Sequence, residues 1–377
     1  MPKFWRIALQ GLLLVLVVGT IALLWHNLTA NLQQQSSQTT RLGFDFLREE
    51  AKFNIGEAAI PYQPSDSYGR AILVGLLNSL KVIAVGIVLA TTLGVTAGIA
   101  RLSNNWLLQK IALFYVEVLR NIPLLLQLFF WYFAFFLSFP KVEQRLQLPG
   151  AIYLTKSGIW LPWLQATSAT GTWLICWIIG GVGAGFILYR QRQTLRPWTV
   201  LQAGAAIVAL SLLALLITHG LPLQFDVPQV IDNFQIQGGL KLSPEFAAIT
   251  TGLSVYTGTF IAEVVRSGIQ AVPRGQWEAA QSLGLSPNVV MGTVIFPQAL
   301  RTILPPLSNQ YLNLAKNSSL AVAVGYPDVY SISDSMNSQT GRPVEAMLVI
   351  IVTYLTISLT LSVLINLYNR SVQIVER

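Results

Sequence analysis

Charged residues are scarce in this sequence. Of its 377 residues, 16 are acidic and 24 are basic, so that 11% carry a charge, whereas the share in an ordinary soluble domain is roughly 25%. Apolar residues make up 53%, and the mean hydropathy is +0.56. A soluble chain of this length would bury a large core but would need more charge on its surface. The composition therefore indicates an integral membrane protein.

Several kinds of functional site are also missing. The one cysteine, Cys176, lies in an apolar stretch, so there is no disulfide framework. His26 and His219 have no ligand-like neighbours, and we expect no metal site. The sequence has no GxxxxGKS or GxxxxGKT motif for ATP phosphates, and no nucleophile beside a base. Because the basic residues form no patch with interleaved aromatics, nucleic-acid binding has no support either.

The longest uncharged stretches are long enough to cross a membrane, for which a helix needs about 20 apolar residues. The sequence predicts an all-α integral membrane protein of about eight transmembrane helices, with the count open by one around 172–217. The expected crossings lie near 7–26, 71–100, 113–139, 172–189, 199–217, 246–268, 298–324 and 346–368. The first is longer than the apolar region of a signal peptide and has no clean cleavage site after it, so we expect a retained anchor helix.

Lysine and arginine predict the orientation. With both termini in the cytoplasm, the inner segments total 56 residues and hold ten Lys or Arg, whereas the outer segments total 126 residues and hold nine. Basic residues concentrate in cytoplasmic loops of membrane proteins. We therefore expect a multi-pass protein whose N- and C-termini are cytoplasmic.

One segment between two predicted crossings has an unusual order of residues. Residues 271–292 read AVPRGQWEAAQSLGLSPNVVMG. Good helix formers run from Gln276 to Leu283, and Gly284 stands where a helix can end in a left-handed residue. We predict a short helix outside the membrane; an ordinary loop with one helical turn is the simpler alternative. Its small residues are Ala279, Ala280 and Gly284.

The same segment resembles a family signature. Glu278-Ala279-Ala280, then Gly284, then Val294-Ile295-Phe296-Pro297 is similar to the EAA signature of the permease subunits of binding-protein-dependent ABC importers. Val294 and Phe296 replace the isoleucine and leucine of that signature and keep their bulk. Further stretches resemble the polar amino-acid branch of the family. They are Arg120-Asn121-Ile122-Pro123 with Gln127, residues 262–273, residues 297–301, and Lys316-Asn317-Ser318-Ser319-Leu320 with Gly325.

The resemblance covers about 71–138 and 244–370 and implies the five-helix core of a type I (MetI-like) ABC permease. The permease domain then spans 71–370. An N-terminal anchor helix and periplasmic segment, 1–70, precede it, and an insertion at 139–243 with two extra helices interrupts it. In this respect the chain looks like the larger permease subunit of general L-amino-acid importers.

The resemblance also implies partners. A second homologous permease would complete the pore, a dimer of ATP-binding-cassette subunits would bind ATP and Mg on the cytoplasmic face, and a periplasmic amino-acid-binding protein would deliver an L-amino acid. This chain would be a transporter subunit of the inner (plasma) membrane, without enzymatic activity or a cofactor of its own. Residues 271–292 would be the coupling segment that contacts the ATPase. Its expected contact residues are Glu278, Ala279, Ala280, Gly284 and Pro297.

A polar face on the crossing near 298–324 predicts the transport path. An amino-acid zwitterion carries two charges, each costing about 2.5–3.5 kcal/mol or more at the centre of a membrane helix, so its path must be polar. The face falls within roughly 120° of a helical wheel and consists of Asn309, Gln310, Asn313, Lys316 and Asn317. We expect Gln310, Asn313, Lys316 and Asn317 to line the path, with hydrogen bonding between helices as the alternative. Because the face has a cation and amides but no carboxylate, we expect acidic and neutral polar amino acids to be carried in preference to basic ones.

The main rival class is a secondary, ion-coupled amino-acid transporter. Such a protein uses carboxylates in mid-membrane and usually has an internal repeat. The acids within the predicted crossings are Glu117 and Glu263, both near an end, and we find no repeat. We expect Glu263 to pair with Arg266, three residues later on the same helix. Arg120 is expected at the inner interface, and Lys81 is expected to snorkel or pack rather than line the path.

Overall fold

A computed structural model of the chain describes residues 43–190, 197–218, 221–232 and 234–372, and a few positions between 15 and 27. The predicted first crossing, 7–26, lies largely outside these residues. The chain divides into two compact units. Unit 1 comprises Met1–Leu128 and Ile249–Arg377, and unit 2 comprises Phe129–Ala248.

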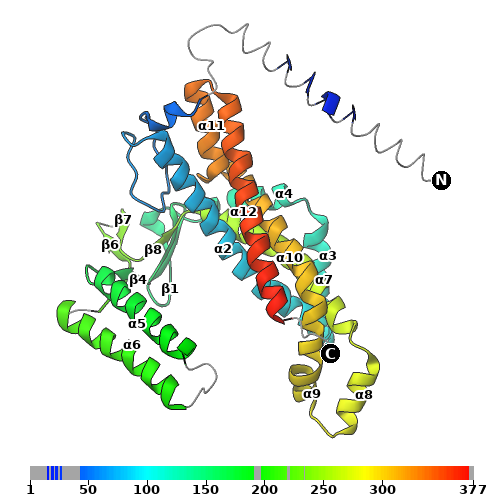
Figure 1. Ribbon diagram of the computed structural model, residues 1–377. Coiled ribbons are helices and arrows are strands. Elements are labelled where there is room, and N and C mark those ends of the chain that lie inside the picture. Colours follow the sequence, from blue (N-terminus) through cyan, green and yellow to red (C-terminus); the bar gives the residue numbers. More distant parts are fainter. Residues whose placement is uncertain are drawn as a thin grey trace. The chain divides into compact units, whose positions relative to one another are not determined.

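Long helices dominate unit 1 (Figure 1). The elements that lie in it or begin or end in it are η1 (Asp45–Arg48), α2 (Tyr68–Ala100), α3 (Trp106–Asn121), α4 (Leu124–Phe129), α7 (Pro244–Gln270), α8 (Arg274–Ser282), α9 (Pro287–Val289), η5 (Val290–Ile295), α10 (Phe296–Asn317), η6 (Ser318–Val324), α11 (Val329–Thr340) and α12 (Pro343–Val372). Within unit 1, α8 and α9 lie at one end of these helices and α11 lies at the other (Figure 1).

Local sequence explains where the first helices begin and end. Ser67 caps α2, its side chain accepting from the backbone N–H of Arg70 at 3.3 Å, and Asn105 caps α3 through two backbone N–H groups. Ile122 precedes Pro123, and its backbone is extended, as a residue before proline prefers. The chain therefore bends by 107° between Trp106–Asn121 and Leu124–Ser138.

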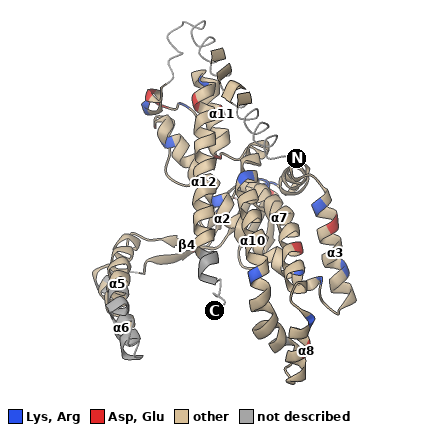
Figure 2. Ribbon diagram, turned by 45° about the vertical axis from the view of Figure 1, so that its right-hand side comes forward, with Lys and Arg blue, Asp and Glu red and all other residues tan. Residues whose placement is uncertain are grey.

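The helices coincide with the crossings expected from the sequence after the first one. In the described residues, α2, α7 and α12 are long and apolar enough to span a membrane, and the bent pair is either a broken fourth span or a re-entrant loop. The middle of α12 carries no charged residue (Figure 2). The helices α5 and α6 are described only in part, and the polar face of α10 lowers its hydropathy. The number eight therefore stays a prediction.

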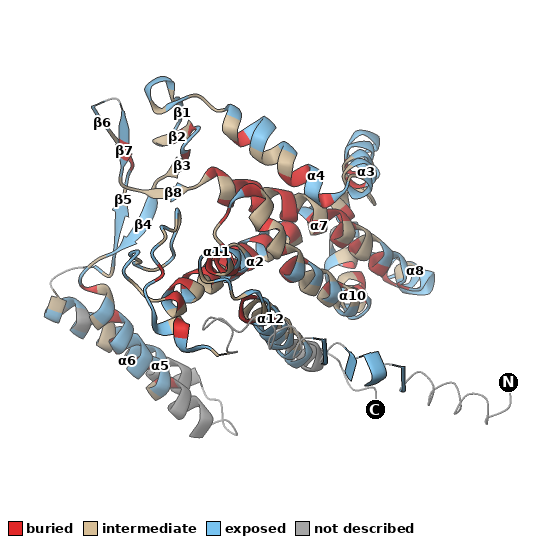
Figure 3. Cartoon of the chain, turned by 90° about the horizontal axis from the view of Figure 1, so that it is seen from above, coloured by how far each residue is buried: buried red, intermediate tan, exposed pale blue. Residues whose placement is uncertain are grey.

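Close glycine contacts join α2 to α7. A Cβ added to Gly94 would lie 2.5 Å from the side chain of Ile261, and one added to Gly98 would lie 2.7 Å from the carbonyl oxygen of Ala262. Small residues four apart let two membrane helices approach this closely. Seen from above, α7 is buried along much of its length, whereas α12 is mostly exposed (Figure 3).

Unit 2 combines a helical hairpin with short strands. The hairpin is α5 (Thr170–Arg190) and α6 (Pro197–Thr218), the extra pair of helices that the sequence predicted. An antiparallel sheet has the strand order β1–β2–β3–β8, and two further antiparallel pairs are β4–β5 and β6–β7. The strands are β1 (Leu146–Leu148), β2 (Ile152–Thr155), β3 (Gly158–Leu161), β4 (Trp163–Ala166), β5 (Leu223–Asp226), β6 (Gln229–Ile231), β7 (Gln235–Gln237) and β8 (Leu240–Leu242).

These strands were not predicted from the sequence. Each has three or four residues, too few for the alternation of apolar and polar residues that identifies a strand. The remaining elements of unit 2 are the short helical turns η2 (Phe130–Phe135), η3 (Phe136–Ser138) and η4 (Val142–Gln144). The chain is nonetheless mostly helical, and the predicted fold class holds.

Candidate functional site

The segment 271–292 forms the predicted short helix. Helix α8 ends at Ser282, and the backbone N–H of Gly284 donates to the carbonyl oxygen of Gln281 at 2.9 Å. Gly284 has a φ of +72°, a conformation that glycine adopts without steric cost. Ser286 and Pro287 then start α9, with the proline in its first turn. A plain loop is therefore excluded for this segment.

The residues expected to contact an ATPase do not share one face. Ala280 is 3% exposed and packs in a core cluster that includes Val272 and Val290. Glu278, Ala279, Gly284 and Pro297 are exposed. The structure therefore turns Ala280 toward the helices and leaves the other small residues on the outer surface.

Leu283 was not singled out from the sequence, yet its side chain is 77% exposed. It lies between α8 and Gly284, with Leu285 also exposed two residues later. The sequence held a signal for Leu283, because it is an apolar side chain in a polar segment predicted to lie outside the membrane. Exposed apolar patches mark contact sites. Leu283 thus joins Glu278 and Gly284 as a surface feature of the coupling segment.

Both neighbouring helices hold the coupling segment. The Nε2 group of Gln298, in the first turn of α10, donates to Oε1 of Gln276 in α8 at 3.2 Å. At the other end, Gly268 of α7 lies tightly against the side chain of Ile303 in α10. These contacts join α8 to the start of α10, and α10 to the end of α7.

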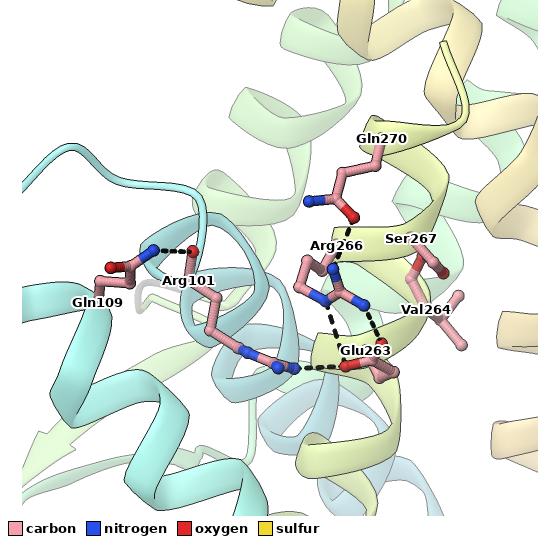
Figure 4. Close-up of polar contacts among 7 residues, drawn as sticks. All are labelled: Arg101, Gln109, Glu263, Val264, Arg266, Ser267 and Gln270. Atoms are coloured by element: carbon pink, nitrogen blue, oxygen red, sulfur yellow. Dashed lines mark hydrogen bonds and ion pairs between the residues drawn. The ribbon is translucent and has the colours of Figure 1, made fainter.

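An ion network fastens α2 to α7 just before the coupling segment (Figure 4). Glu263 accepts from Arg266, as predicted, through both of its carboxylate oxygens, and it also accepts from Arg101 at the end of α2. The second terminal nitrogen of Arg266 donates to Oε1 of Gln270, the last residue of α7, at 2.6 Å. The contact between Arg101 and Glu263 was not predicted, although Arg101 is the first charged residue after an uncharged run of nineteen residues, 82–100.

The predicted polar face of α10 points away from the core of unit 1. Asn313 and Lys316 are exposed, and Gln310 and Asn317 are half-buried. Leu307 and Leu314, on the opposite side of the helix, are buried in the core cluster. Within the described part of the chain, the side chains of Gln310, Asn313, Lys316 and Asn317 form no hydrogen bond or ion pair. No hydrogen bond to another described helix therefore accounts for the polar face.

An apolar cavity of about 480 Å³ lies on another side of α10. Among the described residues, its polar lining groups are Ser308 and the hydroxyls of Thr91 and Tyr311, and these two hydroxyls are hydrogen-bonded to each other at 2.9 Å. No charged or amide side chain of the described residues lines it. A zwitterion would lose its water there without replacement partners, so the cavity is not a candidate substrate site.

The other polar residues considered have structural contacts. Asn78 is fully buried and donates to the carbonyl oxygens of Glu57 and Pro327 at 2.8 and 2.9 Å. Lys81 forms an ion pair with Glu57 at 2.6 Å. The guanidinium carbon of Arg120 lies 5.0 Å from the ring centre of Phe260, within cation–π range.

Comparisons with known proteins agree with the signature in the coupling segment. Residues 90–374 match the family described as binding-protein-dependent transport system inner membrane component. The putative amino-acid ABC transporter permease YhdX of Escherichia coli K12 is 45% identical over 98% of this chain and 94% of its own length. The general L-amino acid transport system permease AapQ of Rhizobium johnstonii is 42% identical over 100% of this chain and 94% of its own.

A third relative is the glutamate/glutamine/aspartate/asparagine transport system permease BztB of Rhodobacter capsulatus. It is 37% identical over 100% of this chain and 95% of its own length. Among solved structures, an amino acid ABC transporter with histidines has a chain that is 23% identical, with a TM-score of 0.49, over 81% of this chain and 95% of its own. The family match spans most of the sequence, from within α2 to the end of α12. This chain therefore belongs to the inner-membrane permease components of binding-protein-dependent ABC transport systems, and it is a transporter subunit rather than an enzyme.

Proposed function

We propose that this chain is one transmembrane subunit of an importer that uses ATP to move polar L-amino acids from the periplasm to the cytoplasm. The observation that carries the proposal is the exposed polar face of α10, opposite a buried apolar face of the same helix. A membrane helix does not present amides and an amine to lipid. This face has no cover within the described residues, and a water-filled path closed by a second, homologous permease supplies one.

The ATPase subunits act on this chain through the coupling segment. A dimer of ATP-binding-cassette subunits, which binds ATP and Mg, contacts Glu278, Ala279, Leu283 and Gly284 on its exposed surface. Rigid-body motion of that dimer moves α8 and, through the contacts of Gln298 and Val272, the helices α10 and α7. The ion network of Glu263 makes the end of α2 follow α7.

The substrate preference follows from the groups on the path. Lys316 attracts a substrate carboxylate, while Gln310, Asn313 and Asn317 exchange neutral hydrogen bonds with the remaining polar groups. No carboxylate is available on this face for a cationic side chain. Glutamate, glutamine, aspartate and asparagine are therefore carried in preference to arginine and lysine. The Rhodobacter relative is named for transport of these four amino acids, which supports this choice.

The coupling segment and both termini lie in the cytoplasm. The excess of lysine and arginine in the corresponding loops supports this orientation. A periplasmic amino-acid-binding protein delivers the substrate to the opposite end of unit 1, which carries α11.

Secondary, ion-coupled transport is the alternative, and the contacts of Glu263 weigh against it. A coupling carboxylate must release its partner ion during each cycle, whereas Glu263 is bonded by two arginines. The deciding experiment is uptake of radiolabelled glutamine into proteoliposomes that contain the purified complex and the binding protein. We expect uptake to require ATP and the ATPase subunits and to be independent of sodium and proton gradients. Uptake by the permeases alone, driven by an ion gradient, would overturn the proposal.

A further inference from the structure

The paired strands β4 and β5 form a ribbon with one apolar face. Leu164 lies opposite Phe225 and Ala166 lies opposite Leu223, while Gln165 pairs with Gln224 and Trp163 with Asp226. Directly paired residues and residues two apart share a face of a sheet. Leucine, phenylalanine and alanine therefore occupy one face, and both glutamines, Asp226 and Trp163 occupy the other.

The apolar face is exposed. The exposed fractions are 50% for Leu164, 62% for Phe225 and 42% for Leu223. A two-stranded ribbon is only marginally stable in water by itself, and an apolar patch on its surface marks a site of contact. Within the described residues, nothing buries these three side chains, so their cover comes from outside these residues.

Hydrogen bonds join the base of the ribbon to the helical hairpin of the same unit. The backbone N–H of Thr167 donates to the carbonyl oxygen of Pro222 at 3.2 Å, and its hydroxyl donates to that of Leu221 at 2.7 Å. The hydroxyl of Thr170, the first residue of α5, also donates to Pro222. The ribbon therefore begins within a few residues of both helices, Thr170 starting α5 and Thr218 ending α6.

The uncharged surface of the hairpin continues into the ribbon. Residues 157–189 and 197–225 contain no charged side chain, and both stretches extend beyond the helices to include β4 and all of β5 except Asp226. The described part of α5 exposes large apolar side chains, such as Ile178 at 64% and Val182 at 68%. An insertion in a soluble compartment would carry charge on its surface. This continuity indicates that the ribbon shares the surroundings of the two helices.

We propose that the apolar face of the β4–β5 ribbon lies in the phospholipid interface where α5 and α6 leave the membrane. Leu164, Leu223 and Phe225 contact the upper acyl chains, and Gln165 and Gln224 face water. The inserted unit is thereby a lipid-bound anchor, whichever side of the membrane it occupies.

Fluorescence quenching at neighbouring positions of β5 tests this placement. In a Cys176→Ser background, an environment-sensitive NBD probe is attached at Phe225→Cys or, as the matched control on the opposite face, at Gln224→Cys. The assembled complex is placed in phosphatidylcholine vesicles that contain spin-labelled phosphatidylcholine, or it is exposed to aqueous iodide. We expect spin-labelled lipid to quench the Phe225 probe severalfold more than the Gln224 probe, and iodide to show the reverse order.

Two other results would overturn the proposal. Equal quenching of both probes by iodide would place the ribbon in water. Protection of the Phe225 probe from both quenchers would mean that a protein covers the face, and protection that appears only on addition of the binding protein would identify that protein. A probe at Leu164→Cys repeats the measurement on the other strand, and glutamine uptake by each labelled complex verifies its assembly.

Discussion

At the scale of single residues, Glu263 connects two helices through one carboxylate. The side chain of Arg101 is only 13% exposed, and that of Glu263 is 30% exposed. Removing the carboxylate leaves two guanidinium groups close together, one of them largely buried, without a counter-charge. Leaving the charged partner of a buried hydrogen bond unpaired is strongly destabilising.

This contact predicts non-additive effects on stability. Glu263→Gln is expected to lower the free energy of unfolding by about 1–3 kcal/mol, more than Arg101→Gln does. The double variant is expected to be no less stable than Glu263→Gln alone, because both changes break the same contact. Thermal unfolding of the purified complex in detergent measures all three variants. Additive losses would show that the two side chains do not interact.

Asp328 predicts a dependence of stability on pH. It is 1% exposed, and burial raises the pKa of its carboxyl to about 6, although it accepts from the backbone N–H of Ser331 at 2.8 Å and from Tyr354 at 2.9 Å. The other charged groups of this region are Glu57 and its partner Lys81. Because the pKa is raised on folding, the contribution of Asp328 to stability is present below the unfolded value of about 3.9 and is lost as pH rises through about 6.

Asp328→Asn keeps an oxygen that can cap α11 and removes the titration. We expect it to raise Tm by a few degrees relative to the parent chain at about pH 7.5, and to lose about half of this advantage at about pH 5. Thermal unfolding at the two pH values provides the comparison. An equal difference between the two proteins at both pH values would assign the effect to packing instead.

At the scale of elements, the sequence predicted helices better than surfaces or strands. The coupling helix and its end at Gly284 were predictable because helix formers and a glycine mark them locally. The burial of Ala280 was not predictable, since it depends on packing against Val272 and Val290, which precede and follow the helix. The strands of the insertion were not predicted, because they are short and because their pairing joins residues as far apart in the sequence as Trp163 and Asp226.

The coupling helix gives a prediction with a matched control. Gly284→Trp places a bulky side chain on the surface proposed for the ATPase contact, and we expect it to abolish ATP hydrolysis stimulated by amino acid. Gly150→Trp is the control, because Gly150, between β1 and β2, also has a positive φ, +86° against +72° for Gly284, and also has open space beside it. Both variants carry the same kind of backbone strain. Equal loss of stimulation in the two intact complexes would assign the effect to strain and remove the coupling role of α8.

At the scale of the whole molecule, the proposed function depends on the polar and apolar sides of α10. One side builds the core through Ile303, Leu307 and Leu314. The other leaves Lys316 and its neighbouring amides without a partner in the described part of the chain. The position of this polar face on the helix was predictable from spacing alone. Its exposure was not, because it depends on which side of α10 the other helices of unit 1 cover.

Competition for glutamate uptake is the measurement that tests this account most directly. Proteoliposomes with the assembled importer take up radiolabelled glutamate in the presence of unlabelled glutamine or arginine, for the parent chain and for Asn317→Asp. We expect glutamine to compete well and arginine poorly in the parent, because the polar face offers a cation and no acid. The added carboxylate of Asn317→Asp is expected to increase competition by arginine severalfold and to weaken glutamate uptake. If arginine competes best in the parent and Asn317→Asp changes nothing, the polar face of α10 does not select the substrate, and the proposed path is wrong.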